Sequence, residues 1–195
     1  MPKIVKLSPY QLHRKRWINC TRCPLCETRK EVVLYRGWID RERIPCDVLF
    51  VGEAPGTSEN TLGKPFIGPA GKLLDRAIED AGGDVERIRL GFTNTLACIP
   101  LDEDGRKVSE VEDWPKEALL RCSPRLLELI EVAEPLKIVA VGVIAEKHLK
   151  KLSVNIDAEI LHPAAILRAN PAQQGLMYQR TVVALREVFE SLIPF

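Results

Sequence analysis

Four short runs of β-branched and large apolar residues recur along the chain, separated by longer amphipathic stretches. Such runs are typical of strands buried in a parallel sheet, and the stretches between them have helical spacing. The predicted strands are Asp47 to Gly52, Ile88 to Asn94, Lys137 to Gly142 and, more weakly, Ala158 to His162; the predicted helices span residues 71–81, 115–133, 143–152 and 174–192. This alternation predicts an α/β fold, a three-layer α/β/α sandwich with a mostly parallel four-stranded central sheet.

The most unusual segments follow three of these strands. They are GEAPG at residues 52–56, TNTLAC at 93–98 and LHPAAILR at 161–168. In open α/β sheets, ligands bind beyond the carboxyl ends of the strands. These three segments are therefore the candidates for a functional site.

The composition narrows the class of protein. With 195 residues, 46% of them hydrophobic, the chain can bury one core but is short for two, so we expect a single domain over residues 1–195. No run of about 18 apolar residues is present to span a bilayer, and the N-terminal stretch lacks the apolar centre of a signal peptide. We expect a cytoplasmic protein with no membrane partner. Because the net charge is only +1, charge alone neither favours nor excludes DNA as a partner.

The stretch VGEAPGTSENTLGKPFIGPAG, residues 51–71, contains five glycines and three prolines. Glycines after a strand let the backbone approach a ligand, and the helix that follows offers free N–H groups, as in a phosphate cradle. However, neither the GK[ST] of a P-loop nor the GxGxxG of a dinucleotide site is present. A nucleotide triphosphatase is thus disfavoured, and an ordinary strand-to-helix turn stays open as an alternative.

Six cysteines are many for a protein of a reducing compartment, which favours metal or cluster ligation over disulfides. Cys20, Cys23 and Cys26 form a CxxCxxC run, but the fourth cysteine and proline of the ferredoxin pattern are missing. A zinc site built on these three would need a distant ligand. Cys98 and Cys122 supply a second pair.

The motif GEAPGTSENTLGKPFIGPAGKLLDRAI closely resembles the first motif of the family-4 uracil-DNA glycosylases, the iron-sulfur branch of that superfamily. Three more segments agree in order: NCTRCPLCETR resembles the first pair of cluster cysteines, TNTLACIP the uracil-recognition strand, and LHPAAILR the catalytic histidine and DNA-insertion loop. The resemblance spans residues 17–190. It implies a monofunctional DNA-repair enzyme that flips uracil out of single- or double-stranded DNA, hydrolyses its N-glycosidic bond and leaves an abasic site.

Within this resemblance, Gly52, Phe66 and Asn94 are the predicted base-binding residues. Phe66 would stack on the flipped base, although a core phenylalanine is the alternative. The Asn94 amide carries both a donor and an acceptor, so it can pair with O4 and N3–H of uracil, whereas cytosine presents the opposite pattern. A turn or capping role for Asn94 stays open.

The predicted catalytic residues are Glu53, Glu59 and His162. Cleavage builds positive charge on the sugar and negative charge on the departing base. Glu53 would polarise water and offset the sugar's charge, His162 would donate to O2 of the leaving base, and Glu59 is a second carboxylate candidate. His13 and His148 lie among lysines and arginines, so we expect them on solvated faces.

The resemblance also implies DNA-binding and metal-binding residues. Ile166 stands where the superfamily places an apolar wedge, with helix packing as the alternative, and Arg168 is a predicted phosphate contact. The resemblance places a structural [4Fe-4S] cluster on Cys20, Cys23, Cys98 and Cys122, which would tie the N-terminal segment to the core. Cys26 is an alternative ligand, and Cys46 is expected to be a small core residue. A monomer is expected.

The chain also departs from the family pattern. Asn60 stands where an acidic residue is common, and the segment between residues 152 and 162 is shorter than usual. The charged loop at residues 100–113, which we expect to be solvated, lacks the basic, histidine-containing insertion of cross-linking relatives, so permanent attachment to DNA is not expected. Two other functions stay open: a glycosylase for another damaged or modified base, and a catalytically weak DNA-binding relative.

Overall fold

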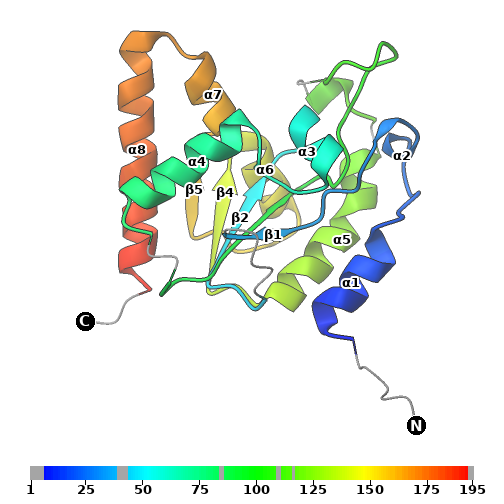
Figure 1. The fold of residues 1–195 in the computed structure, drawn as a ribbon, viewed down its shortest axis with the longest axis horizontal. Helices are drawn as coiled ribbons and strands as arrows, with labels where there is room; N and C mark the ends of the chain where they lie inside the picture. The colour runs from blue at the N-terminus through cyan, green and yellow to red at the C-terminus, as the bar shows by residue number, and fades with distance from the viewer. Residues whose placement is uncertain (1–6, 39–43, 84–85, 109–110, 116, 193–195) are drawn as a thin grey trace.

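The computed structural model describes residues 7–38, 44–83, 86–108, 111–115 and 117–192 (Figure 1). Its sheet has the strand order β1-β3-β2-β4-β5. The strands are β1 (Arg36–Gly37), β2 (Val48–Gly52), β3 (Leu90–Asn94), β4 (Lys137–Val141) and β5 (Ala158–Ile160). The last four are the predicted strands and pair in parallel. The predicted count of four was one too low, because β1, a two-residue edge strand antiparallel to β3, is too short to leave a periodic pattern.

Eight α-helices surround this sheet in the described residues. They are α1 (Pro9–Trp17), α2 (Leu25–Thr28), α3 (Thr57–Leu62), α4 (Pro69–Asp80), α5 (Ala118–Ala133), α6 (Val143–Lys151), α7 (Pro163–Arg168) and α8 (Pro171–Glu190). The four predicted helices are α4, α5, α6 and α8. The Ser8 hydroxyl and the Gln11 side chain form a capping box at the start of α1, and Asn170 caps α8.

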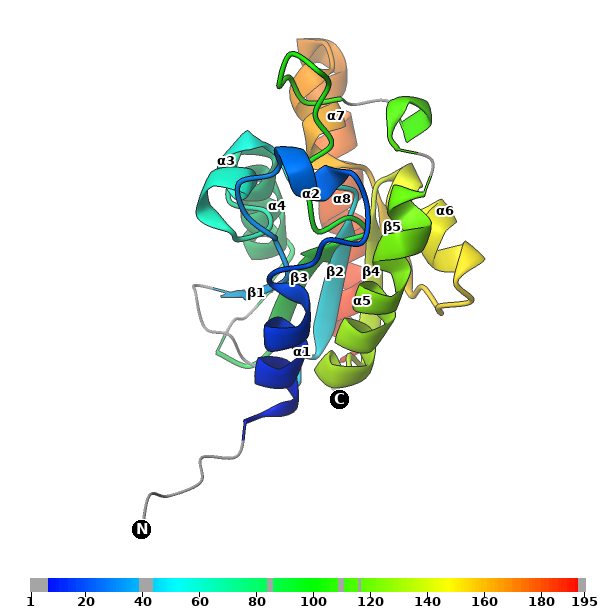
Figure 2. The same ribbon diagram turned by 90° about the vertical axis from the view of Figure 1, so that its right-hand side faces the viewer.

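Alternating side chains of the central strands divide the core in two. Leu49 and Val51 of β2 face a cluster that includes residues of α1, α5 and α6. Val48 and Phe50 face a second cluster, with residues of α4 and α8. Helices therefore cover both faces of the sheet, and α1 and α5 lie side by side (Figures 1 and 2). The predicted three-layer α/β/α architecture is confirmed.

The prediction that His13 and His148 lie on solvated faces was wrong. His13 is fully buried on the inner side of α1, between the rings of Tyr10 and Trp17. His148 is also buried, with its Nε2 3.1 Å from the Ser123 hydroxyl. In both cases the neighbouring basic residues occupy the outer face of a helix while the imidazole occupies the inner face. Of the helices described, none is both long and apolar enough to cross a membrane.

Candidate active site

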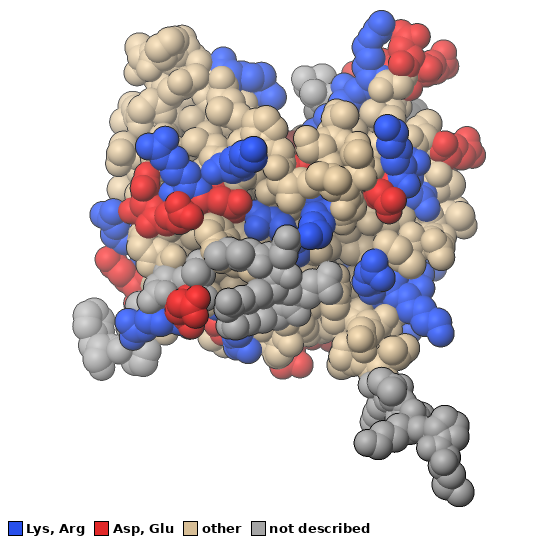
Figure 3. All heavy atoms as spheres, viewed as in Figure 1, with Lys and Arg blue, Asp and Glu red and all other residues tan. Residues whose placement is uncertain are grey.

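A cavity of about 250 Å³ lies beyond the carboxyl ends of the central strands. The loop that carries α3, the start of α4, the end of β3 and the start of α7 all contribute to its walls. Figure 3 shows the surface hollowed at this end of the molecule, with lysines and arginines on both sides and acidic side chains beside them on the right. Four of the predicted site residues line this one cavity, namely Glu59, Phe66, Asn94 and His162.

Gly52, Phe66 and Asn94 are packed against one another at the base of the cavity. Gly52 ends β2 and lies opposite Asn94, which ends β3. A Cβ atom on Gly52 would approach the Phe66 ring to 2.3 Å and Asn94 Oδ1 to 2.5 Å. Only glycine therefore fits between the two side chains, and this explains why β2 ends in glycine.

The Phe66 backbone has an unusual conformation for a bulky residue, with φ of 55°. Three contacts hold it there. Arg36 donates to the carbonyl oxygens of Pro65 at 2.8 Å and Phe66 at 3.0 Å, and Gly71 of α4 packs so closely that a Cβ would lie 1.9 Å from the Phe66 oxygen. Arg36 is itself anchored by Asp75 at 2.7 Å. The Phe66 ring is thus fixed at the cavity by buried neighbours.

His162 follows β5 and caps α7. Its Nδ1 accepts a hydrogen bond from the Ala164 amide at 3.2 Å, so in the neutral ring the proton lies on Nε2. Burial, together with the positive charges of Lys107 and Arg168, lowers the pKa of His162 to about 4, although the Glu59 carboxylate opposes this shift. Near neutral pH the imidazole is therefore an uncharged hydrogen-bond donor.

The two predicted carboxylates have different surroundings. Glu59 is buried and accepts hydrogen bonds from the amides of Gly56, Ile67 and Gly68 at 2.8 to 3.1 Å, so its carboxylate holds the loop together. Glu53 directly follows β2 and is half-buried. It lies beside the cavity, because the next residue, Ala54, lines the cavity wall. The catalytic roles of both carboxylates stay predictions.

The predicted DNA-binding residues lie outside the cavity. Ile166 is 3% exposed and packs in a groove between α4 and α8, whereas the adjacent Leu167 is 45% exposed. Arg168 is exposed at the end of α7, close enough for its charge to act on His162. Their roles in DNA binding stay predictions.

Lys107 lines the cavity and belongs to the loop that we expected to be solvated; residues 102–107 are exposed, as predicted. The described part of that loop folds back as a hairpin, in which Leu101 pairs with Lys107. Its residues 109–110 lie outside the described residues. A cationic side chain in a loop of mixed charge gives no sequence signal, which is why Lys107 was missed.

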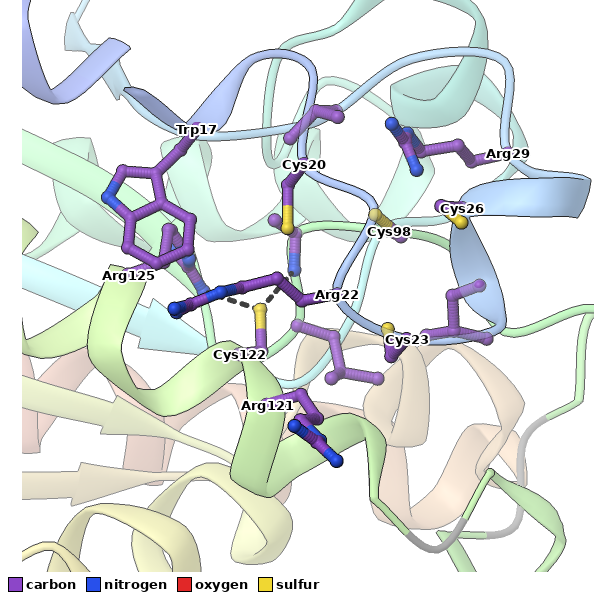
Figure 4. A pocket seen from close by; sticks show the side chains of 14 residues that line it. Trp17, Cys20, Arg22, Cys23, Cys26, Arg29, Cys98, Arg121, Cys122 and Arg125 are labelled. Atoms are coloured by element: carbon purple, nitrogen blue, oxygen red, sulfur yellow. Dashed lines mark hydrogen bonds between the residues drawn. The ribbon is translucent and has the colours of Figure 1, made fainter. Parts of the chain in front are cut away.

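A second pocket contains the predicted cluster cysteines. Figure 4 shows Cys20, Cys23, Cys98 and Cys122 around one space, with Cys26 beside them. All five of these cysteines line the pocket. Their pocket is also lined by four arginines, Arg22, Arg29, Arg121 and Arg125.

All six cysteines are free thiols. Burial raises the pKa of Cys98 to about 12 and also raises the pKa of Cys23. Within the described ranges, no three His, Cys, Asp or Glu side chains converge on a single metal-ion position. Cys46 lies apart, just before β2, and is fully buried, as predicted.

Comparison with known proteins agrees with this arrangement. Residues 40–186 match the uracil DNA glycosylase superfamily, and the chain belongs to it. It is 33% identical over 179 residues to the type-4 uracil-DNA glycosylase of Pyrobaculum aerophilum, covering 80% of this chain and 83% of that protein. The enzymes of the same name from Saccharolobus solfataricus and Thermotoga maritima are 33% and 34% identical, over 59% and 58% of their lengths. Within the superfamily, the chain is a member of the type-4 family, as the sequence motifs predicted.

Proposed function

We propose that this protein hydrolyses the N-glycosidic bond of deoxyuridine in DNA, releasing uracil and leaving an abasic site. The observation that carries this proposal is the juxtaposition of an aromatic ring, a buried carboxamide and a neutral imidazole donor around one cavity. Enzymes that act on a base must take it out of the stack and hold it in such a pocket. The basic residues on both sides of the hollow suit a DNA backbone (Figure 3).

Phe66 and Asn94 would recognise the base. The Phe66 ring offers a flat apolar surface for stacking, and Gly52 leaves room for the ring beside Asn94. The Asn94 side chain would donate to O4 of uracil and accept from N3–H. Cytosine would leave both hydrogen bonds unmade, and unpaired polar groups in a buried site oppose its binding.

Bond cleavage transfers the electron pair of the C1′–N1 bond to the base. His162 Nε2–H would donate to O2 of the uracil as its negative charge grows, and the cation of Lys107 at the cavity would add to this stabilisation. Glu53 would orient the attacking water and offset the positive charge on the sugar. The water oxygen then forms the new bond to C1′ and releases a proton to solvent, and the uracil anion takes up a proton from solvent. Glu59 would hold the loop that shapes the pocket.

We also propose that Cys20, Cys23, Cys98 and Cys122 hold a [4Fe-4S] cluster. Four free thiols around one space, with arginines beside them, would fit an anionic iron–sulfur group, whereas they do not converge on one point as a single metal ion would require. When bound, the cluster supplies iron–thiolate crosslinks and negative charge, while the hydrolysis transfers no electrons. The crosslinks would fasten the N-terminal segment to the end of β3 and to α5.

The test is single-turnover excision from oligonucleotides that carry uracil, cytosine, thymine or hypoxanthine, as single strands and duplexes, with alkaline cleavage of the abasic product. We expect His162→Ala to slow uracil release by about 10²- to 10³-fold, the usual loss for a donor that stabilises a developing anion. Asn94→Asp should weaken uracil excision and give some cytosine excision. Asn155→Asp, at an exposed position, is the matched control. Preferred release of hypoxanthine or thymine, or no release at all, would overturn the proposal.

A further inference from the structure

Arg125 is among the largest fully buried side chains of the protein, at 1% exposure. It projects from α5 toward the end of β3. Its Nη1 donates to the Thr93 hydroxyl at 3.0 Å, and its Nη2 donates to the backbone oxygens of Asn94 at 2.6 Å and Thr95 at 2.9 Å. One guanidinium therefore holds three consecutive residues, Thr93, Asn94 and Thr95, and the middle one is the proposed base-binding residue.

The same guanidinium borders the cysteine pocket. Its Nη2 lies 3.7 Å from Cys122 Sγ, and Figure 4 shows Arg125 beside the thiols. Its Nε is buried and has no hydrogen-bond partner, and Nη1 of Arg29, which lines the same pocket, is in the same state. Across the described residues, no carboxylate forms an ion pair with Arg125.

A buried guanidinium without a counterion is strongly unfavourable, because desolvation removes its hydration and no opposite charge offsets this loss. The contacts with carbonyl and hydroxyl oxygens compensate only in part. A negative charge in the cysteine pocket, which Arg125 borders, would neutralise the positive charge of the guanidinium. Thiolates that hold an iron–sulfur group carry such a negative charge. The two sites are thus joined through one side chain.

We propose that Arg125 is a positioning residue that couples the cysteine site to uracil recognition. The anionic cluster balances its charge, and Arg125 in turn fixes the Asn94 and Thr95 carbonyls so that the Asn94 amide stays directed at the base. This inference rests on the functions proposed for both sites. It assigns to the cluster an effect on base binding that operates through electrostatics and needs no electron transfer.

The first test compares thermal unfolding of the iron-loaded protein with that of the protein after iron removal by a chelator. Arg125→Met keeps the length of the side chain and removes its charge. In the loaded protein it should lower the melting temperature, because hydrogen bonds and charge balance are both lost. In the iron-free protein the fall should be smaller, since the substitution also removes an unbalanced charge. An equal or larger fall in the iron-free protein would overturn the proposal.

The second test needs only loaded protein, in case the iron-free chain does not fold. It measures the rate of iron release to a chelator, followed by the loss of absorbance near 400 nm, and the affinity for free uracil as an inhibitor. Arg125→Met should release iron faster and bind uracil more weakly. Arg125→Lys keeps the positive charge, but an ammonium group lacks the planar set of donors that holds the carbonyls of Asn94 and Thr95 together. It should therefore retain iron as the wild type does, but bind uracil as weakly as Arg125→Met. Equal behaviour of the two variants in both assays would contradict the coupling.

Arg186→Met is the matched control. Arg186 lies on α8, is exposed, donates to the backbone oxygen of Asp80 at 3.3 Å, and lines neither the cysteine pocket nor the base cavity. Its removal should change neither iron release nor uracil affinity. If wild-type protein holds no iron or excises no uracil, the proposed functions fail on those measurements themselves, so their failure is distinguishable from a failure of the coupling.

Discussion

Arg36→Met should destabilise the protein and loosen Phe66, the residue that we propose stacks on the base. Arg36 is buried, makes two hydrogen bonds to the backbone around Phe66, pairs with Asp75 at 2.7 Å, and has its guanidinium carbon 3.9 Å from the centre of the Phe92 ring. These contacts oppose the strain of the positive φ at Phe66, a conformation that costs about 1–3 kcal/mol for a residue with a side chain. Methionine fills similar space and supplies none of the polar contacts.

The expected magnitude follows from these contacts. Removing one partner of a buried ion pair costs about 3–5 kcal/mol, and a hydrogen bond from a charged donor contributes about 1.5–3 kcal/mol, but these losses overlap and are not additive. The Asp75 side chain is 32% exposed and its pKa is raised by burial, so after the loss of Arg36 it can be hydrated or take up a proton. We therefore expect the lower end, about 3 kcal/mol.

The assay is urea unfolding combined with the affinity for free uracil, measured as inhibition of single-turnover excision. Adding Asp75→Asn to Arg36→Met should recover part of the stability, because no unpaired carboxylate is left, but it should not recover uracil binding, because Phe66 stays unsupported. Arg76→Met, at a neighbouring exposed position, is the control and should change neither quantity. A loss below about 1 kcal/mol, the size typical of an exposed ion pair, or unchanged uracil binding in the single variant, would refute the reasoning.

Two further predictions concern pH and the cysteines. His13 is fully buried and its pKa is lowered to about 4 by burial and by the charge of Arg125, so between pH 6.5 and 4 the unfolded chain binds a proton that the folded protein does not. His13 should therefore contribute about 3 kcal/mol to the fall in the free energy of unfolding over this range, and His13→Gln should remove that contribution from the urea-unfolding profile; equal slopes in the two proteins would contradict the assignment. Aerobically purified protein should be brown, with absorbance at about 400 nm. Absorbance and iron content should be lost in Cys98→Ser and kept in Cys46→Ser. A protein that stays colourless after iron and sulfide reconstitution would exclude the cluster.

The sequence predicted the elements that a local pattern defines. The apolar runs that became β2, β3, β4 and β5 are each long enough to show their character, and the segments after them could be assigned to one edge because parallel strands share it. The sequence of α1 does contain a helical pattern, which we did not recognise. Its buried residues Tyr10, His13 and Trp17 have helical spacing, and the basic residues between them hid this pattern.

The buried arginines could not have been predicted in this way. Arg36 and Arg125 are stabilised by groups far away in the sequence, such as the carbonyl oxygen of Phe66 and that of Asn94. An isolated arginine in a sequence is most often exposed, so only the assembled fold identifies these two. The burial of Ile166 likewise depends on how α7 docks between α4 and α8 and not on its own residues.

The Glu59 carboxylate has a consequence for the chemistry open to the glycine-rich loop. The amides of Ile67 and Gly68 lie at the start of α4, where the backbone of many other proteins binds a phosphate. Here a side chain from the same loop occupies that position and also satisfies the amide of Gly56. The Glu59 carboxylate thus occupies the position at which a nucleotide-binding loop would bind a phosphate. A phosphate could bind there only by displacing this carboxylate, which accepts three hydrogen bonds. The backbone amides of this loop are therefore satisfied by its own glutamate, and this agrees with our proposal that the neighbouring cavity takes an uncharged base.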